Sequence, residues 1–196
     1  MKRSRKKKGQ KKSRKGKVLL LLILIGIGVA VLFFSRHEIF NSIRPWLEKR
    51  SFVEKKKEIL LYFSDPESEY LVGEKRKIQK RDELREEAKE AIVELIKGPK
   101  GKLIPTLPPR TKLLTLQISE AGVAKVNFNQ ALSKDHPGGS TAEMMTLYSI
   151  VNSLSLNFPE IKKVQILMDG KPVETIAGHL SLREPVPPKT DLIKRQ

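Results

Sequence analysis

The hydrophobic positions from residue 56 onward predict a domain that mixes strands with amphipathic helices. The continuous apolar run 59–63 (ILLYF) is typical of a strand buried on both faces. The turn 64–66 (SDP) reverses the chain, and residues 70–78 return as a second, more polar strand. Apolar residues then recur at helical spacing over 84–96, which predicts a helix with one buried face.

Both ends of this helix carry terminus signals. Asp82 is a candidate N-cap, whose carboxylate would accept an otherwise unpaired backbone N–H of the first turn. Gly98 followed by Pro99 is a typical stop, because glycine adopts the left-handed conformation and proline cannot continue the helix.

Two alternating stretches then predict a hairpin with one apolar face. The segment 119–122 (SEAG) between them fits a type I turn that is closed by a glycine with positive φ. The apolar face consists of Leu114, Leu116, Ile118, Ala124, Val126 and Phe128.

A second helix is predicted to open at Gly138-Gly139-Ser140 and to end at Pro159. Ser140 and Glu143 match a capping box, in which each side chain satisfies a backbone N–H at the helix start. The apolar stripe of this helix, which we interpret as core and not as a cofactor-binding face, consists of Met144, Leu147, Tyr148, Val151, Leu154 and Phe158.

Asp169-Gly170 is the strongest hairpin signal in the chain. Residues 164–168 alternate into it and residues 173–176 return, while Pro172 lacks a ladder donor and therefore predicts an edge strand. The element order is ββαββαββ. It predicts an α+β fold in which two amphipathic helices pack on one mostly antiparallel mixed sheet of about six strands.

The amino terminus predicts a membrane anchor. Residues 1–17 hold eleven Lys and Arg and no acidic residue, and the 17 residues of 18–34 carry no charge. A helix of that length spans about 26 Å, close to the hydrocarbon core of a bilayer. Since Lys- and Arg-rich flanks stay in the cytoplasm, we expect one transmembrane helix over 18–35 and an extracytoplasmic domain after it, in a periplasm or at a cell surface. The alternative is a cleaved signal peptide, but the segment after Phe34 offers no small-residue cleavage site.

The net charge of +17 also suggests a nucleic-acid binder. Without the eleven basic residues of the tail, 28 of the 39 Lys and Arg remain against 22 Asp and Glu, a net charge of +6 over residues 18–196. The charge is therefore a topology signal, and we expect the cytoplasmic membrane and no nucleic acid among the partners. The absence of cysteine from the sequence excludes disulfides and thiolate chemistry.

One segment precedes the domain and another follows it. The apolar side chains of 36–55, with Trp46 among them, lie either in the headgroup zone or against the domain. The proline-rich end reads as an extended, mostly disordered tail. The predicted organisation is a basic tail at 1–17, a transmembrane helix at 18–35, a stalk at 36–55, a domain at 56–184 and a tail at 185–196.

An ordered series of short motifs resembles the GerMN domain of sporulation and spore-germination proteins. The series covers about residues 56–184 and comprises 61–65 (LYFSD), 71–76 (LVGEKR), 95–99 (LIKGP), 139–143 (GSTAE), 149–154 (SIVNSL), 164–171 (VQILMDGK) and 178–180 (GHL). The resemblance implies an extracytoplasmic, non-catalytic module with a role in sporulation or germination. Asn127 and Ser181 stand where acidic residues would be more typical of the family.

Candidate chemistry is sparse. His37, His136 and His179 show no metal-binding spacing, and we expect neither a metal nor a cofactor. Asp135 and His136 beside Ser140 could be drawn as a catalytic triad, but neighbouring residues of an extended segment point apart and Ser140 already has a role as a cap. We therefore expect no enzymatic activity, and a hydrolase of wall peptides is the least favoured hypothesis.

The first functional hypothesis is an interaction module that assembles with itself or with envelope partners, motivated by the expected sheet edge near Pro172. The second is binding of a small ligand or of peptidoglycan between the Gly138-Gly139 loop and the Gly178-His179 loop, with free N–H groups of the helix start as an anion site. His179 either pins the carboxyl-terminal loop or senses pH. The residues that could serve a ligand, an interface or the fold are Gly138, Gly139, Ser140, Glu143, Asp169, Gly170, Gly178 and His179.

Overall fold

The computed structural model describes residues 19–30 and 55–194. Residues 19–30 are helical, and among the described residues no helix is long and apolar enough to cross a membrane. The predicted transmembrane segment 18–35 extends beyond the described helix at both ends. The basic tail 1–17 and the stalk up to residue 54 lie outside the described residues. Residues 55–194 belong to one compact unit.

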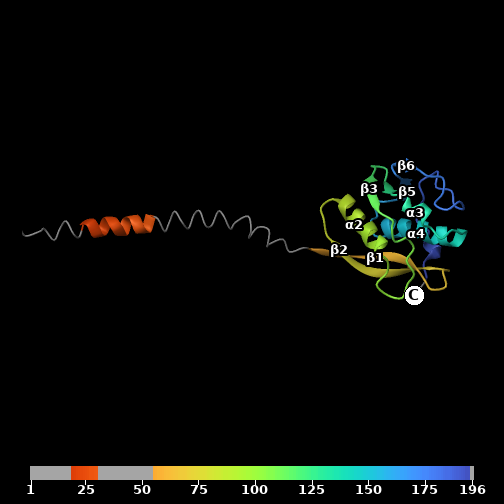
Figure 1. The fold of residues 1–196 in the computed structure, drawn as a ribbon, viewed down its shortest axis with the longest axis horizontal. Helices are drawn as coiled ribbons and strands as arrows, with labels where there is room; N and C mark the ends of the chain where they lie inside the picture. Colours follow the sequence, from red (N-terminus) through yellow and green to blue (C-terminus); the bar gives the residue numbers. More distant parts are fainter. Residues whose placement is uncertain (1–18, 31–54, 195–196) are drawn as a thin grey trace, which may run out of the picture. The chain divides into compact units, whose positions relative to one another are not determined.

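This unit has three layers (Figure 1). The first is an antiparallel hairpin, the second contains two helices, and the third is a sheet in the order β3-β4-β5-β6 in which only the β4–β5 pair is parallel. The elements are β1 (Lys56–Ser64), β2 (Leu71–Gln79), α2 (Leu84–Ile96), β3 (Leu113–Ile118), β4 (Val123–Phe128), α3 (Ala131–Lys134), α4 (Ser140–Ser155), β5 (Lys163–Met168), β6 (Lys171–Pro172) and the 3-10 turn η1 (Thr190–Leu192).

The mixed α+β class is confirmed, but the prediction of one six-stranded sheet is wrong, because β1 and β2 form a separate sheet. The two helices lie between the sheets, with α4 against both β1 and β5 and α2 against both β2 and β3. Ala88 and Ala91 of α2 are fully buried, and their small side chains allow close approach on this face. The middle layer therefore needs apolar side chains on two sides, which a single-sheet arrangement would not require.

The predicted hairpin from β3 to β4 is present, and Leu116, Ala124, Val126 and Phe128 form part of the buried core. Leu114 does not, since its side chain is 47% exposed. The register of β3 against β4 shifts between Leu113 and Thr115. Such an extra residue reverses which side chain faces the core, so that Leu113 packs there in place of Leu114.

Two helix starts differ from their predictions. The N-cap of α2 is Glu83 and not Asp82, and its side chain makes no capping hydrogen bond. The N-cap of α4 is Gly139, so Ser140 is already the first helical residue and the predicted capping box does not form. The predicted stop at Gly98 is confirmed, with φ at 81° and an N–H that donates to Leu95 O.

The carboxyl-terminal part departs most from expectation. The return strand was predicted over 173–176, whereas β6 contains only Lys171 and Pro172. Residues 185–194, expected to be a disordered tail, contact the domain. Val186 bridges Val164 of β5, and Ile193 bridges Leu71 of β2. This segment therefore connects the two outer layers and is part of the fold.

Gly122 provides a test of the register between β4 and the segment that precedes β5. Its φ is 77°, and a Cβ atom at this position would lie 2.6 Å from the backbone oxygen of Glu160. We expect Gly122→Ala to lower the free energy of unfolding by about 3 kcal/mol, because backbone strain and a steric clash add. Gly170→Ala is the matched control, since φ is also positive there but no atom lies within 4 Å of the added Cβ. That variant should lose only about 1 kcal/mol. Denaturant unfolding of both full-length variants measures the difference, and equal losses would contradict this packing.

Candidate functional site

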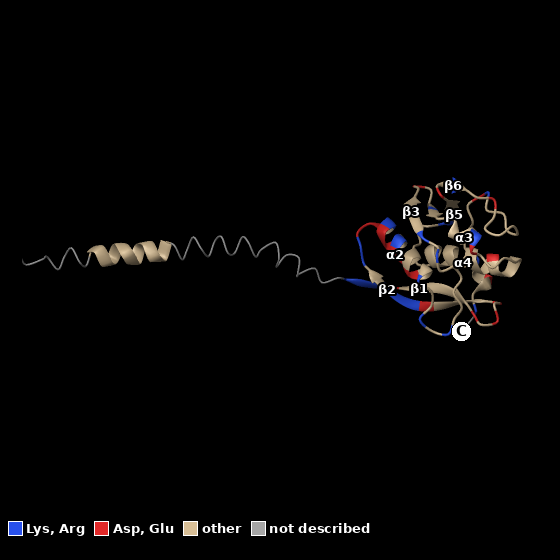
Figure 2. Ribbon diagram, in the orientation of Figure 1, with Lys and Arg blue, Asp and Glu red and all other residues tan. Residues whose placement is uncertain are grey.

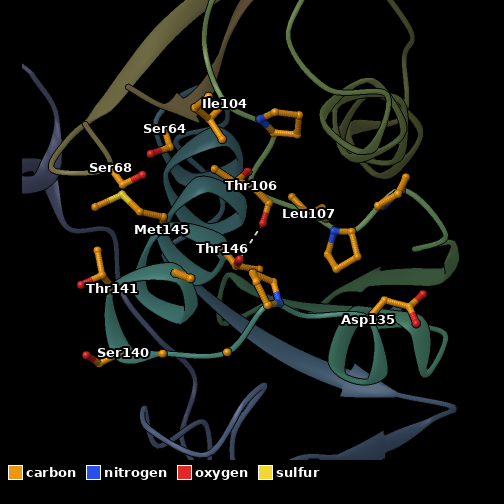
Figure 3. A pocket seen from close by; sticks show the side chains of 17 residues that line it. Ser64, Ser68, Ile104, Thr106, Leu107, Asp135, Ser140, Thr141, Met145 and Thr146 are labelled. Atoms are coloured by element: carbon orange, nitrogen blue, oxygen red, sulfur yellow. Dashed lines mark hydrogen bonds between the residues drawn. The ribbon is translucent and has the colours of Figure 1, made fainter. Parts of the chain in front are cut away.

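Gly138, Gly139 and Ser140 line a pocket of about 670 Å³ at the start of α4. The proline-bearing loop after α2 lines the pocket as well, with Pro105, Pro108 and Pro109 among its residues. Thr106 and Leu107 of this loop lie across the pocket from Ser140 (Figure 3). The lining is more apolar than polar, and Met145 and Thr146 of α4 close the base. The pocket thus lies between the Gly138-Gly139 loop and the proline-bearing loop. The predicted cleft between the Gly138-Gly139 loop and the Gly178-His179 loop is not where this pocket forms.

His136 fixes the glycine loop of this pocket. Its Nδ1 atom accepts the N–H of Gly138 at 3.0 Å, and its Nε2 atom lies 3.0 Å from Oγ1 of Thr146. The Thr146 hydroxyl donates to Thr106 O, so it must accept from the imidazole, which assigns the neutral Nε2–H tautomer. Burial lowers the pKa of His136, although the negative charge of Glu143 partly opposes this shift. The bonding pattern explains His136 as a structural residue and leaves no triad with Asp135 and Ser140.

Glu143 is fully buried and binds a different loop from the one that the capping box implied. Its Oε1 atom accepts the N–H groups of Ile176 and Ala177 at 2.8 and 3.1 Å, and its Oε2 atom accepts the N–H of His179 at 2.8 Å. Burial would raise the pKa of Glu143, but the hydrogen bonds from the 176–180 backbone outweigh it and hold the pKa below its ordinary value. Glu143 therefore anchors the loop after β6 to the first turn of α4.

The Gly178-His179 loop is thus brought to the helix start by a carboxylate. It is the backbone of His179, and not its imidazole, that makes the contact with Glu143. Gly178 has φ at 97° and its N–H donates to Thr175 Oγ1. The pinning of this loop is therefore present, with Glu143 in the role that sequence reasoning gave to His179.

Asp169 and Gly170 form the tight turn between β5 and β6. Both have positive φ, and the Asp169 N–H donates to Phe128 O. The Gly170 N–H donates to Oδ1 of Asn127 at 2.8 Å. Asn127, which stands where an acidic residue would be more typical of the GerMN pattern, thus keeps an oxygen acceptor for the turn without a buried charge.

Strand edges are the other feature of the domain that can bind a partner, and most of them are blocked. Along β1, the Asn157 side chain accepts the N–H of Leu60 at 2.9 Å and donates to its C=O at 2.6 Å, while the Tyr62 N–H donates to Ser153 Oγ. Ser64 pairs with Ile104 through both backbone groups. A side chain of α4, a side chain of the turn after it and one residue of a loop thus take the place of a third strand.

The outer edges of β2 and β6 are blocked by other means. Leu71 of β2 accepts the N–H of Lys194, and the Gln79 N–H donates to Glu90. Between these two points stand the exposed lysines 75 and 77, and such charges discourage edge pairing. Figure 2 shows the basic residues of the β1–β2 hairpin in blue. The β6 strand has two residues, of which Pro172 has no N–H to offer.

The edge of β3 is open in the part of the chain that the structure describes. The Ser119 N–H donates to Val123 O, so in an antiparallel ladder residues 117 and 115 also bond toward β4. The N–H and C=O groups of Leu116 and Ile118 then point away from the sheet, and no side chain or loop among the described residues bonds to them. The strand LLTLQI carries no charge and no proline. Sequence reasoning placed the binding edge near Pro172 and missed this one, although an uncharged alternating strand is a signal for it.

Replacement of Glu143 separates the two roles considered for it. We expect Glu143→Gln to lower the free energy of unfolding by about 2 to 3 kcal/mol, because an amide NH₂ would face backbone donors in a buried position. Ser140→Ala should change it by less than about 0.5 kcal/mol, since Ser140 makes no capping hydrogen bond. Denaturant unfolding of the two full-length variants is the measurement. A loss of about 1 kcal/mol for Ser140→Ala would instead support the capping box and contradict this assignment.

The pKa of His136 predicts a pH dependence of stability. Because the folded-state pKa lies below the ordinary value of about 6.5, the unfolded chain binds the proton first, and stability falls as the pH drops through about 6.5 toward the folded-state pKa. The lowered pKa of Glu143 causes a separate loss that begins only below about pH 4.5. We expect His136→Gln to flatten the stability curve between about pH 7 and 5 and to leave the acid limb in place. Thermal unfolding across pH tests this, and an unchanged slope between pH 7 and 5 would contradict it.

Comparisons with known proteins agree with this fold. The family model described as "Germane: Sporulation and spore germination" matches residues 60–174. A candidate lipoprotein from Clostridium perfringens is 27% identical, with 69% of this chain and 89% of that chain covered and a TM-score of 0.50. The first GerMN domain of the sporulation protein GerM from Bacillus subtilis is 17% identical, with 67% and 97% covered and a TM-score of 0.54. The tandem GerMN domains of GerM are also 17% identical, with 70% and 48% covered and a TM-score of 0.53.

The two GerM structures share the fold with this chain, and the chain spans about half the length of the tandem pair. No curated protein matches the chain. The family model covers more than half of the chain, and its matched region runs from β1 to just beyond β6. This chain therefore belongs to the Germane family of sporulation and spore germination.

Proposed function

We propose that this chain presents its GerMN-like domain outside the cytoplasmic membrane, as a non-catalytic module that binds protein partners in the cell envelope. The charge pattern of residues 1–34 supports the location, because eleven basic residues precede an uncharged apolar segment. The described part of that segment, residues 19–30, is helical and uncharged. The similar Clostridium perfringens chain, described as a candidate lipoprotein, agrees with attachment to a membrane.

The open edge of β3 is the observation that carries the interaction role. A strand edge with free N–H and C=O groups can add a strand from another chain, and the new backbone hydrogen bonds supply affinity. Asn157 and Ser153 close the edge of β1, Lys194 and Glu90 close only the two ends of β2, and Pro172 limits β6. The middle of β2 instead carries the exposed lysines 75 and 77, whose charges discourage edge pairing. The contrast between these edges and β3 favours β3 as the docking strand.

A second candidate function is the binding of a small ligand or of peptidoglycan. The pocket beside Gly138 and Gly139 supports it, because its volume suits a small molecule and one wall is built from prolines. Soluble wall fragments that move the amide signals of Gly138 and Gly139 in the full-length protein would favour this candidate over the first.

The absence of cysteine from the sequence allows a direct test with single-cysteine variants in intact cells. We expect Gln117→Cys on β3 to react with a membrane-impermeant bifunctional maleimide and to yield a discrete crosslinked protein product. Lys163→Cys on β5 is the matched control, since that position is also exposed but lies on an inner strand. It should be labelled equally and crosslinked at least about fivefold less.

The outcomes separate the two parts of the proposal. If the reagent labels neither variant until the cells are opened, the extracytoplasmic location is wrong. If both variants crosslink equally, the edge of β3 is not the docking site. The product from Gln117→Cys should also disappear in the Ile118→Pro background, where an outward N–H is lost but the ladder to β4 is retained. Thermal unfolding checks that this background is folded.

A further inference from the structure

We propose that the strand that docks on β3 is β3 of a second copy of this chain. The two strands would be antiparallel and related by a two-fold axis that passes between the two copies of Leu116. This inference rests on the proposed function, because it names the partner of the same edge. The outward N–H and C=O of Leu116 would bond to Leu116 of the other copy, which is the arrangement that an antiparallel pair allows at its axis. The two four-stranded sheets would then form one continuous sheet.

The charges at the ends of β3 favour a second copy over an arbitrary strand. Lys112 precedes the strand and Glu120 follows it, and both are exposed. Antiparallel pairing about Leu116 brings the start of one strand to the end of the other, so Lys112 of each copy lies near Glu120 of its partner. Opposite charges across strands stabilise a pair, and here the same two residues supply them twice.

The side chains of β3 create no charge repulsion between two copies of the strand. Residues 113–118 carry no charge, and the exposed pair in this register is Thr115 opposite Gln117, both polar and neutral. An antiparallel pairing of β2 about residue 75, 76 or 77 would instead place an exposed lysine, 75 or 77, directly opposite a lysine of the other copy. Like charges directly opposite destabilise a strand pair, so the two terminal strands differ in their capacity for self-association.

Confinement to a membrane would strengthen this contact. A single strand edge forms a small interface, and its association in dilute solution is correspondingly weak. Chains held in the same bilayer meet at a higher effective concentration, which raises the fraction of pairs without any new contact. We therefore expect the pair in membranes and its loss on dilution in detergent.

Disulfide formation between two single-cysteine chains tests the register. Thr115 and Gln117 would lie opposite each other at a non-hydrogen-bonded position, with Cα atoms about 4.5 Å apart, which suits a disulfide. Full-length Thr115→Cys and Gln117→Cys chains co-produced in membranes should give at least about ten times more mixed dimer on oxidation than Thr115→Cys with Lys125→Cys. Lys125 is the control because it is exposed but lies one strand further from the interface. Equal yields in the two experiments would overturn the proposal.

Two double variants with matched surface changes test the charge logic. In Thr115→Lys/Gln117→Lys, lysines face lysines across the pair, whereas in Thr115→Lys/Gln117→Glu each lysine faces a glutamate. Energy transfer between full-length chains that are labelled at Lys163→Cys and reconstituted in phosphatidylcholine vesicles reports the pair. We expect the Lys/Lys variant to lose at least about four-fifths of the transfer and the Lys/Glu variant to keep it. Transfer in the Lys/Lys variant at the unsubstituted level would overturn the proposal.

Failure of this proposal is distinguishable from failure of the proposed function. If the mixed disulfide does not form while Gln117→Cys still crosslinks to a different protein in intact cells, β3 docks another partner and the self-pairing is wrong. If Gln117→Cys also crosslinks no better than Lys163→Cys, both are wrong.

Discussion

Glu143 places a negative charge where no water reaches it and uses that charge to hold a distant loop. The carboxylate accepts backbone N–H groups from Ile176, Ala177 and His179, which lie more than 30 residues further along the chain. A buried carboxylate without such partners would be strongly destabilising, and one with three of them keeps a lowered pKa. The loop after β6 is short of regular structure, so this single side chain replaces the ladder that a longer return strand would have supplied.

The same solution recurs around the domain. Asp65 accepts the N–H groups of Glu69 and Tyr70 in the turn from β1 to β2, and Glu74 accepts those of Lys100 and Gly101 after α2. In both residues burial pushes the pKa upward, and the hydrogen bonds and a neighbouring cation bring it below the ordinary value. Glu143, Asp65 and Glu74 therefore fix loops, and this role accounts for their lowered pKa values.

Asparagines of α4 and of the turn after it hold extended segments through backbone hydrogen bonds, as the carboxylates hold turns. Asn157 bonds to both backbone groups of Leu60, and Asn152 bonds in the same way to both groups of Lys189. A side-chain amide has the same donor and acceptor as a peptide, so each asparagine imitates one residue of a neighbouring strand. This explains why α4 is buried nearly all round although it carries Thr146, Ser149, Asn152 and Ser153 on its surface.

Local patterns predicted the elements that local physics controls. The period-two stretches at β3 and β4, the glycine turn at Gly122 and the stop at Gly98 all depend on residues close in sequence. The sequence from Ser140 to Glu143 is compatible with a capping box and with a buried Glu143 that anchors a loop. Only the position of residues 176–180, which are distant in sequence, decides between the two. The pocket wall at Pro105 and Pro108 and the course of residues 185–194 likewise depend on contacts between distant segments. Met145 and Ile150, apolar residues of α4 that lie outside the predicted stripe and are buried, were an available signal of its burial between two sheets.

The layer order bears on how the open edge can be used. The chain enters the domain at β1, in the hairpin layer, whereas β3 belongs to the layer on the other side of the helices (Figure 1). A partner strand on β3 would extend a sheet that shares no strand with the β1–β2 hairpin, so docking would require no change in that hairpin. Native domains commonly protect terminal strands with charge, proline or a covering segment, and β1, β2 and β6 show all three devices. Among the described residues, the edge strand β3 has none of these protections and is flanked by Lys112 and Glu120. This difference is better explained if the edge of β3 binds a partner.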